Sequence, residues 1–415
     1  MVYQTVVRSL LGGPNSPKLP EGYILKNGVK PIKGFKYNHP LDGHGFINAI
    51  KISKRGIEYK GIRQETYHYK RELEANEMLY RGLGTNCGET FLLNNFNNVS
   101  VFVNDDTVYS LGEGGVPYII DVETGRTIGS KQMGNIPTKF TESLPYFPLS
   151  AHPMKVDDDV YNMSCLNYAL TIFKNDNAIH TEVFPFGECY YTHDFKVTED
   201  WFVFFLNRVD LSLIDAYFKN KTIFESIKFK EGNKILLVDR KSFKSHYVDI
   251  TELNMGTLHI AYAHQVDDVI KIYSSLNEKV TLQNAKTPYQ FDGCKLHRIT
   301  IETKSFRYYC SEKLLDIDGE MPVEREGIIY MVNKHTLLKY DTNKDSCLSF
   351  EVHDAILEEP VVHGNFVFLI GHMMYHNKTI LYCINKMTLT LVHEHIFDFI
   401  MPYGFHGTFY EKEGL

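Results

Sequence analysis

Histidine is the residue type in this chain with the clearest potential for chemistry. The sequence has 18 histidines, and a neutral imidazole is a common ligand for zinc, copper and iron. Their local spacing does not form a compact metal loop. There is no His-Glu-x-x-His motif, and the pairs His372 with His376 and His393 with His395 lack a further flanking ligand. Spacing alone therefore favours surface or hydrogen-bonded roles for most of them.

Four histidines lie in segments with a distinctive local sequence. The segments are Ser150-Ala-His-Pro-Met-Lys, Tyr191-Thr-His-Asp-Phe, Leu258-His-Ile-Ala-Tyr-Ala-His-Gln and Pro402-Tyr-Gly-Phe-His-Gly-Thr-Phe, and they contain His152, His193, His259 and His406. In these segments the chain resembles the carotenoid cleavage oxygenase family, which includes stilbene cleavers and the retinoid isomerohydrolase. Members of that family carry Ala-His-Pro, His-Asp-Phe, His-x-x-Asn-Ala-aromatic-Glu and Tyr-Gly-x-His-Gly segments in the same order.

The resemblance extends over about residues 19 to 409. Leu19-Pro-Glu-Gly-Tyr-Ile-Leu-Lys-Asn-Gly, Pro40-Leu-Asp-Gly-His-Gly-Phe-Ile-Asn-Ala and Glu113-Gly-Gly-Val-Pro-Tyr resemble further family motifs. It implies a seven-bladed β-propeller with a short helical and loop cap over its top face. It also implies that each of the four histidines supplies one ligand to a mononuclear, non-haem Fe2+ ion.

The resemblance also implies three glutamates that hold ligand histidines from behind. By motif these are Glu113, Glu320 in Gly319-Glu-Met-Pro, and Glu359 in Glu358-Glu-Pro-Val-Val. Two alternatives remain open from the sequence: Glu358 could take the place of its neighbour, and Glu320 could be an ordinary surface charge.

Such glutamates have a physical purpose. A neutral imidazole that binds a metal through one nitrogen must donate its other N–H elsewhere, and a carboxylate partner fixes the tautomer and the ring angle. Carboxylates also offset the double positive charge that four neutral ligands leave on the ion, which would otherwise be costly in an apolar centre. Four ligands leave up to two positions of an octahedral ion open. Imidazole alone would suit zinc or copper equally, so only the resemblance selects iron.

The chain departs from the family at several motif positions. His44 replaces the second Asp of an Asp-Gly-Asp-Gly-Met segment, Tyr262 and Gln265 stand where Asn and Glu are usual, and Val99 stands where many members have Thr. None of these changes removes a ligand. They indicate a divergent member whose substrate should not be inferred from close relatives.

The elements that must position these side chains read as short strands. Examples are 46–52, 99–103, 108–111, 201–206, 234–238, 327–332, 366–370 and 379–384, most of them bounded by turn residues such as Asn104-Asp105-Asp106. Serial hairpins of this kind suit propeller blades, although periodicity alone leaves a sandwich or paired barrels open. No Pro- or Ser-rich linker divides the chain, so we predict one domain over residues 1–415, with residues 1–18 as an N-terminal extension.

Composition narrows the functional classes. The net charge of -7 and the pI near 6.2 argue against a nucleic-acid partner, because phosphate binding needs a concentrated basic surface. Seven scattered cysteines without a Cys-x-x-Cys pair suit free thiols in a reducing compartment. No stretch approaches the ~20 apolar residues of a membrane span. We therefore predict a cytoplasmic protein that can contact a membrane peripherally.

The resemblance to this family implies a dioxygenase. The expected partners are O2 and an apolar conjugated alkene, and the expected reaction cleaves a carbon–carbon double bond of a carotenoid or apocarotenoid into two carbonyl products. A stilbenoid-cleaving oxygenase and a retinoid isomerohydrolase would share the same ligands. A non-catalytic propeller scaffold is the alternative of a different class, and it would have no need for the four histidines.

Overall fold

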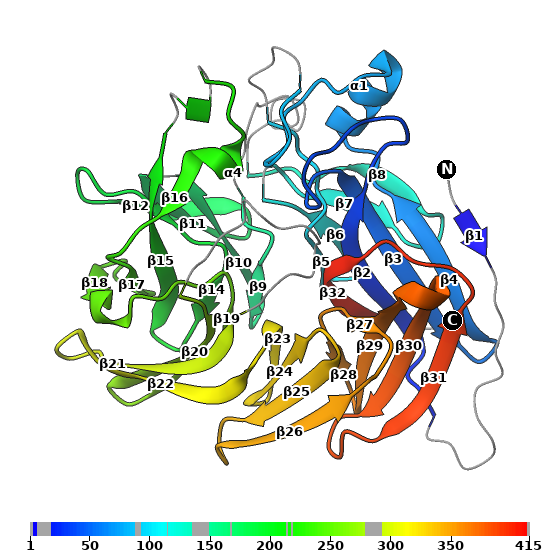
Figure 1. The fold of residues 1–415 in the computed structure, drawn as a ribbon. Coiled ribbons are helices and arrows are strands. Elements are labelled where there is room, and N and C mark those ends of the chain that lie inside the picture. Colours follow the sequence, from blue (N-terminus) through cyan, green and yellow to red (C-terminus); the bar gives the residue numbers. More distant parts are fainter. Residues whose placement is uncertain are drawn as a thin grey trace.

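The computed structural model shows seven sheets arranged around an axis (Figure 1). It describes residues 3–5, 18–87, 93–113, 115–134, 149–166, 168–212, 215–216, 219–278 and 293–412. The predicted seven-bladed β-propeller is therefore confirmed, and the sandwich and the paired barrels are excluded. We number the sheets as blades in chain order, with the sheet that contains both ends of the described chain as blade 7.

The first four blades follow one another along the chain. Blade 1 contains β5 (Ser100–Asn104), β6 (Thr107–Leu111), β7 (Tyr118–Asp121) and β8 (Arg126–Ser130); blade 2 contains β9 (Met154–Val156), β10 (Asp159–Leu166), β11 (Ala169–Lys174) and β12 (Asn177–Val183); blade 3 contains β13 (Tyr190–Tyr191), β14 (Phe195–Val197), β15 (Trp201–Leu211), β16 (Ile227–Phe229), β17 (Lys234–Asp239) and β18 (Ser245–Asp249); blade 4 contains β19 (Ile260–Val266), β20 (Val269–Leu276), β21 (Lys295–Glu302) and β22 (Arg307–Asp318).

The last three blades complete the ring. Blade 5 contains β23 (Glu320–Arg325), β24 (Ile328–Asn333), β25 (Thr336–Asp341) and β26 (Ser346–Glu351); blade 6 contains β27 (Ile356–Leu357), β28 (Val361–His363), β29 (Phe366–Met373), β30 (Lys378–Asn385) and β31 (Leu391–Phe397); blade 7 contains β1 (Tyr3–Thr5), β2 (Gly22–Lys30), β3 (His44–Ser53), β4 (Gly56–Arg63) and β32 (Gly404–Glu411). Blade 7 closes the ring, because β32 pairs antiparallel with β2 from the other end of the chain.

One strand of each blade lies nearest the axis. Neighbouring blades meet there through contacts of β9 with β14, β14 with β19, β19 with β23, β23 with β28, β28 with β32, and β32 with β5. The inner strands are thus β5, β9, β14, β19, β23, β28 and β32. Residues at the start of these strands come together although they are far apart in the sequence, which is the property a metal centre needs.

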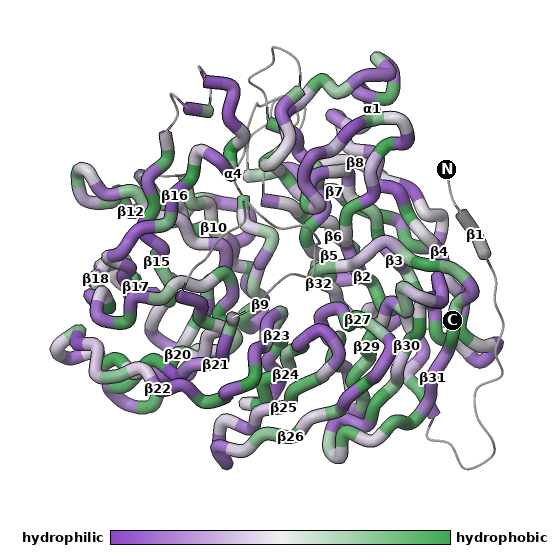
Figure 2. The backbone as a smooth tube through the Cα atoms, viewed as in Figure 1, coloured by the Kyte–Doolittle hydropathy of each residue, from purple (hydrophilic) through white to green (hydrophobic). Residues whose placement is uncertain are grey.

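The hydrophobic core lies between adjacent blades. One cluster joins Ile24 and Ile50 of blade 7 to Phe368 and Leu381 of blade 6, and another joins blades 3 and 4. Middle strands such as β29 and β30 are buried on both faces, and Figure 2 shows hydrophobic residues along them. The outer strand β26 is mostly exposed and polar. Packing between blades thus holds the inner strands in place around the axis.

Several turn signals read from the sequence do form tight turns. Asp105 and Asp106 connect β5 to β6 with φ of 46° and 62°, and Asn175 and Asp176 connect β11 to β12 with φ of 46° and 68°. Two positive φ values in succession define the two-residue hairpin turn whose twist matches that of the strands, and Asn and Asp tolerate it well.

In the part of the chain that the structure describes, the helices with defined bounds are few and short. They are α1 (Tyr67–Ala75), α4 (Ile223–Ser226), and two single turns of 3-10 helix, η1 (Thr251–Leu253) and η2 (Met374–His376). The backbone N–H of Phe224 in α4 donates to the carbonyl of Leu83, so α4 contacts the segment that follows α1. Within the described residues, none of the helices has the length and apolar character needed to cross a membrane.

The cysteines and the N-terminal segment bear on two of the sequence predictions. All seven cysteines are free, as the absence of a disulfide framework predicted. Most of the predicted N-terminal extension, residues 1–18, lies outside the described residues. Its short strand β1 pairs with β4 at the outer edge of blade 7.

Candidate metal centre

The four histidines singled out in the sequence lie at the axis. His152 precedes β9, His193 lies between β13 and β14, His259 directly precedes β19, and His406 is in β32. Each therefore sits at the start of an inner strand, in blades 2, 3, 4 and 7. Their ligand atoms all lie within 4.8 Å of one another, and no other cluster of His, Cys, Asp or Glu suited to a metal is found in the described part of the chain.

The distances between the ring nitrogens fit one shared metal ion. Nε2 of His152 lies 2.9 Å from Nε2 of His193, and Nε2 of His259 lies 3.2 Å from Nε2 of His406. Two imidazoles that bind one ion at about 2.1 Å and at right angles place their nitrogens about 3 Å apart. The observed distances therefore suit a single metal position that all four rings share.

The arrangement of the rings indicates how the four ligands surround that position. Five of the six ring pairs have centroids 4.4 to 5.3 Å apart, whereas the rings of His193 and His406 are 6.4 Å apart. A tetrahedron would make all six separations equal, and a square would make two of them long. One long separation matches four positions of an octahedron in which the two remaining positions are adjacent.

Two of the four rings are held from behind by buried glutamates. Nδ1 of His259 lies 2.8 Å from Oε2 of Glu320, and Nδ1 of His406 lies 2.7 Å from Oε1 of Glu359. Glu320 is the first residue of inner strand β23 and Glu359 precedes inner strand β28. Each carboxylate fixes the Nδ1–H tautomer, which turns the Nε2 lone pair toward the axis.

Glu113, the third predicted glutamate, lies farther from its histidine than the other two do. Oε1 of Glu113 accepts the backbone N–H of Ala151 at 2.9 Å and lies 3.4 Å from Nδ1 of His193. The hydroxyl of Tyr191 lies 3.3 Å from the same Nδ1. The Glu113 side chain is 22% exposed, against 2% for Glu320 and 6% for Glu359. No described carboxylate pairs with His152.

Burial and these partners set the protonation of the rings. Burial lowers the pKa of His152 far below its usual value, and the imidazoles around it add to the effect. Burial also lowers the pKa of His406, although the Glu359 carboxylate opposes the shift. At His259 burial is outweighed by the Glu320 carboxylate, and the net pKa is raised. Two of the ligand rings are thus neutral at pH 7, which is the form that binds a metal.

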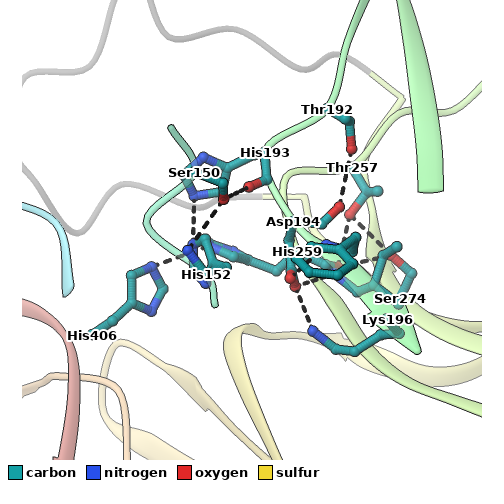
Figure 3. Close-up of polar contacts among 12 residues, drawn as sticks. Ser150, His152, Thr192, His193, Asp194, Lys196, Thr257, His259, Ser274 and His406 are labelled. Carbon is teal, nitrogen blue, oxygen red and sulfur yellow. Dashed lines mark hydrogen bonds and ion pairs between the residues drawn. The ribbon is translucent and has the colours of Figure 1, made fainter. Parts of the chain in front are cut away.

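Hydroxyl groups fix the backbone on either side of the ligands (Figure 3). The Ser150 hydroxyl donates to the carbonyl of His193 at 2.9 Å, so it ties two ligand segments together. The hydroxyls of Thr257 and Ser274 both donate to the carbonyl of His259, at 3.0 and 2.8 Å. These residues went unnoticed in the sequence because serine and threonine beside a histidine carry no specific signal.

Asp194 connects two further ligand segments. Its Oδ2 accepts the backbone N–H of Ile260 at 3.1 Å and the ammonium of Lys196 at 2.7 Å, as Figure 3 shows for the lysine. Asp194 follows His193 and Ile260 follows His259, so this carboxylate ties the backbone beside one ring to the backbone beside the other. The His-Asp-Phe segment was recognised in the sequence, but no role was assigned to its aspartate.

The structure gives different partners to Glu358 and Glu359, the two adjacent glutamates between which the sequence did not decide. Glu359 contacts His406, whereas Oε1 of Glu358 contacts Nε2 of His372 at 2.8 Å and accepts the N–H of Gly404 at 2.6 Å. Glu358 therefore anchors the start of β32, two residues before His406. His372 belongs with the histidines expected to be structural.

Comparison with known proteins identifies the family. A family model described as retinal pigment epithelial membrane protein (RPE65) matches residues 16–411. The chain belongs to this family. The sequence-based assignment to the carotenoid cleavage oxygenases is therefore confirmed.

Two curated members of the RPE65 and carotenoid oxygenase family are similar in sequence. Apocarotenoid-15,15'-oxygenase of Synechocystis sp. is 28% identical over 244 residues, which cover 52% of this chain and 47% of that protein. Resveratrol cleavage oxygenase 1 of Botryotinia fuckeliana is 25% identical over 183 residues, which cover 40% of this chain and 31% of that protein. The chain thus aligns with about half the length, or less, of these relatives.

Solved structures of the family share the fold. The cobalt-substituted Synechocystis apocarotenoid oxygenase has a TM-score of 0.84 at 20% identity, and the match covers 99% of this chain and 96% of that one. A chimera of that enzyme with RPE65 has a TM-score of 0.83 at 20% identity with the same coverage. At this identity the likeness supports the propeller architecture.

Proposed function

We propose that the protein is a non-haem Fe(II) dioxygenase that cleaves a carbon–carbon double bond of a carotenoid or apocarotenoid. The observation that carries the proposal is the convergence of four Nε2 atoms at the axis, with buried carboxylates fixed behind His259 and His406. The similarity to a protein named apocarotenoid oxygenase supports the substrate class.

The donor set fits a divalent first-row metal. Four imidazole nitrogens of intermediate softness suit iron, zinc, copper or cobalt, and the two free positions suit an ion that must accept further ligands. Bound iron would supply an open coordination position for O2 and the redox chemistry that oxygen activation requires. Family membership favours iron over the other ions.

The side chains of the centre have a simple task in this reaction. An alkene and O2 give two carbonyl compounds without net gain or loss of protons, so no general acid or base is needed. Glu320 and Glu359 hold His259 and His406 in one tautomer, and burial of these rings keeps bulk water from the ligand position. The protein thus contributes orientation and a fixed electrostatic environment.

A stilbenoid is the second candidate substrate. The similarity to a protein named resveratrol cleavage oxygenase favours it, and such an enzyme would use the same four histidines. Retinyl ester isomerohydrolysis is a third candidate reaction within the family and consumes no O2. A non-catalytic scaffold would gain nothing from four imidazoles converging at the axis.

Metal content and O2 uptake of anaerobically purified protein test the proposal. We expect near-stoichiometric iron in the wild type, its loss in His259→Ala, and O2 consumption with two carbonyl products when an apocarotenoid is added. His264→Ala is the matched control and should retain iron, because His264 is an exposed residue of β19, the strand that His259 precedes. Uptake only with a stilbenoid would reassign the substrate. Protein that takes up no Fe(II) on reconstitution would contradict the metal site.

A further inference from the structure

A buried lysine lies beside the metal centre. Lys26 in β2 is 0% exposed. Its ammonium donates to the carbonyl of Phe405 at 2.7 Å, to the carbonyl of Glu359 at 2.9 Å and to Oε2 of Glu359 at 3.4 Å. An ammonium has three N–H donors, so every donor has a partner and the buried charge is paired.

The side chain of Lys26 reaches Glu359 by crossing β32. In the ladder between β2 and β32, Lys26 is opposite Gly407. A Cβ at position 407 would overlap Cδ of Lys26, and a Cβ at position 404 would lie 2.7 Å from Cβ of Lys26. The two glycines of the Tyr-Gly-x-His-Gly segment thus leave the space through which the lysine passes beneath His406.

Glu359 differs from Glu113 and Glu320 because its carboxylate contacts a lysine. Oε1 of Glu359 contacts His406, while its Oε2 accepts the N–H of Gly407 at 3.0 Å and faces Lys26. Among the described residues, no lysine or arginine pairs with Glu113 or Glu320. The carboxylate behind His406 therefore shares its charge with a cation, and those behind the other rings do not.

We propose that Lys26 is a positioning residue that sets the net charge of the metal centre and so favours a divalent over a trivalent ion. This inference rests on the proposed iron site but not on its substrate. Lys26 adds one positive charge in contact with the carboxylate behind His406. A trivalent ion would bring one more positive charge than a divalent ion toward this buried ammonium, and like charges repel strongly where water is excluded.

The midpoint potential of the Fe(III)/Fe(II) couple in the metal-loaded protein tests the inference. Lys26→Met keeps the aliphatic length and removes the charge. We therefore expect the ferric-to-ferrous ratio at a fixed potential to rise at least about tenfold, which is a fall of about 59 mV in the midpoint. Glu359→Gln should shift the midpoint upward. The double variant restores the charge balance and should lie close to the wild type.

Lys339→Met is a matched control. Lys339 is also buried, and its ammonium donates to the carbonyls of Lys386 and Met387 at 2.8 Å, in contact with blade 6 and with no ligand histidine. It should leave the potential unchanged. If the role of Lys26 is purely structural, Lys26→Met should lose stability, as Lys339→Met does, without a shift in the midpoint potential.

The outcomes separate this inference from the proposed function. Equal potentials in wild type and Lys26→Met overturn the inference, as does a double variant shifted as far as Lys26→Met alone. If Lys26→Met does not fold, Glu359→Gln and the double variant still differ by the same charge, and equal potentials in these two also overturn it. Wild-type protein that binds no iron overturns both proposals. Iron-loaded protein that cleaves no carotenoid overturns only the substrate.

Discussion

The carboxylate of Glu320 offers the most direct test of how the protein tunes its ligands. In Glu320→Gln the side chain keeps its shape and one acceptor oxygen, but the charge is lost. In the wild type, Oε2 of Glu320 accepts from Nδ1 of His259 at 2.8 Å and from the backbone N–H of Met321. An amide oxygen in the same place can accept both bonds, so the variant isolates the effect of charge.

The expected loss of metal affinity follows from the strength of that bond. A hydrogen bond to a charged group contributes about 1.5–3 kcal/mol, against about 1 kcal/mol for a neutral one. Glu320 is 2% exposed, so water compensates little. The difference of about 1.5 kcal/mol corresponds to roughly a tenfold larger dissociation constant. Glu320→Ala also removes the acceptor, and we expect a loss of affinity of up to about 100-fold.

Competition between the protein and a chromophoric chelator for Co(II) measures these constants without any enzymatic assay. Glu326→Gln, whose side chain is 80% exposed in the same blade, is the control and should bind as the wild type does. Folding of each variant is checked by circular dichroism. A folded Glu320→Gln with wild-type affinity for Co(II) would refute the argument that a carboxylate behind the ring strengthens it as a ligand.

Three further predictions concern stability. Gly407→Ala places a Cβ against the Leu25 carbonyl and the Lys26 side chain and should lower the unfolding temperature markedly, whereas Gly129→Ala, with nothing within 4 Å of its Cβ, should change stability by no more than about 0.5 kcal/mol. Burial lowers the pKa of His68 to about 4, so the unfolded chain binds more protons below pH 6.5; stability should fall by roughly 3 kcal/mol between pH 6.5 and 4, and His68→Gln should flatten that slope in urea titrations. Removing metal with a chelator should lower the unfolding temperature, since a ligand at 100 times its dissociation constant stabilises the folded state by about 2.7 kcal/mol; His259→Ala should abolish the difference between metal-loaded and metal-free protein.

Local signals made much of the fold predictable. The run 46–52 lies within β3 and the run 366–370 within β29, because buried β-branched and aromatic residues bounded by turn residues specify strands through short-range physics. The seven-bladed arrangement came from the resemblance, since strand periodicity is the same in a sandwich. The pairing of β32 with β2 joins the two ends of the described chain, and no local pattern encodes it.

The candidate site was predictable where its residues occur in recognisable segments. His152, His193, His259 and His406 each stand in such a segment, and the structure places their rings together. Lys26 was read only as part of an opening motif. Its contacts with Glu359 and Phe405 join β2 to segments that are adjacent to it only in the closed ring, so its role depends on tertiary structure that the sequence pattern does not contain.

The closure of the ring by β32 has a consequence for the biosynthesis of this protein. A ribosome makes β2 long before β32, so the edge of β2 that pairs with β32 stays unpaired while the strands between them are made. The strand β32 also carries His406, and until it docks the axis holds only three of the four imidazoles. The fourth imidazole therefore reaches the axis only when the ring closes. Until β32 docks, an exposed strand edge invites pairing with other chains, which makes a chaperone most valuable in that interval.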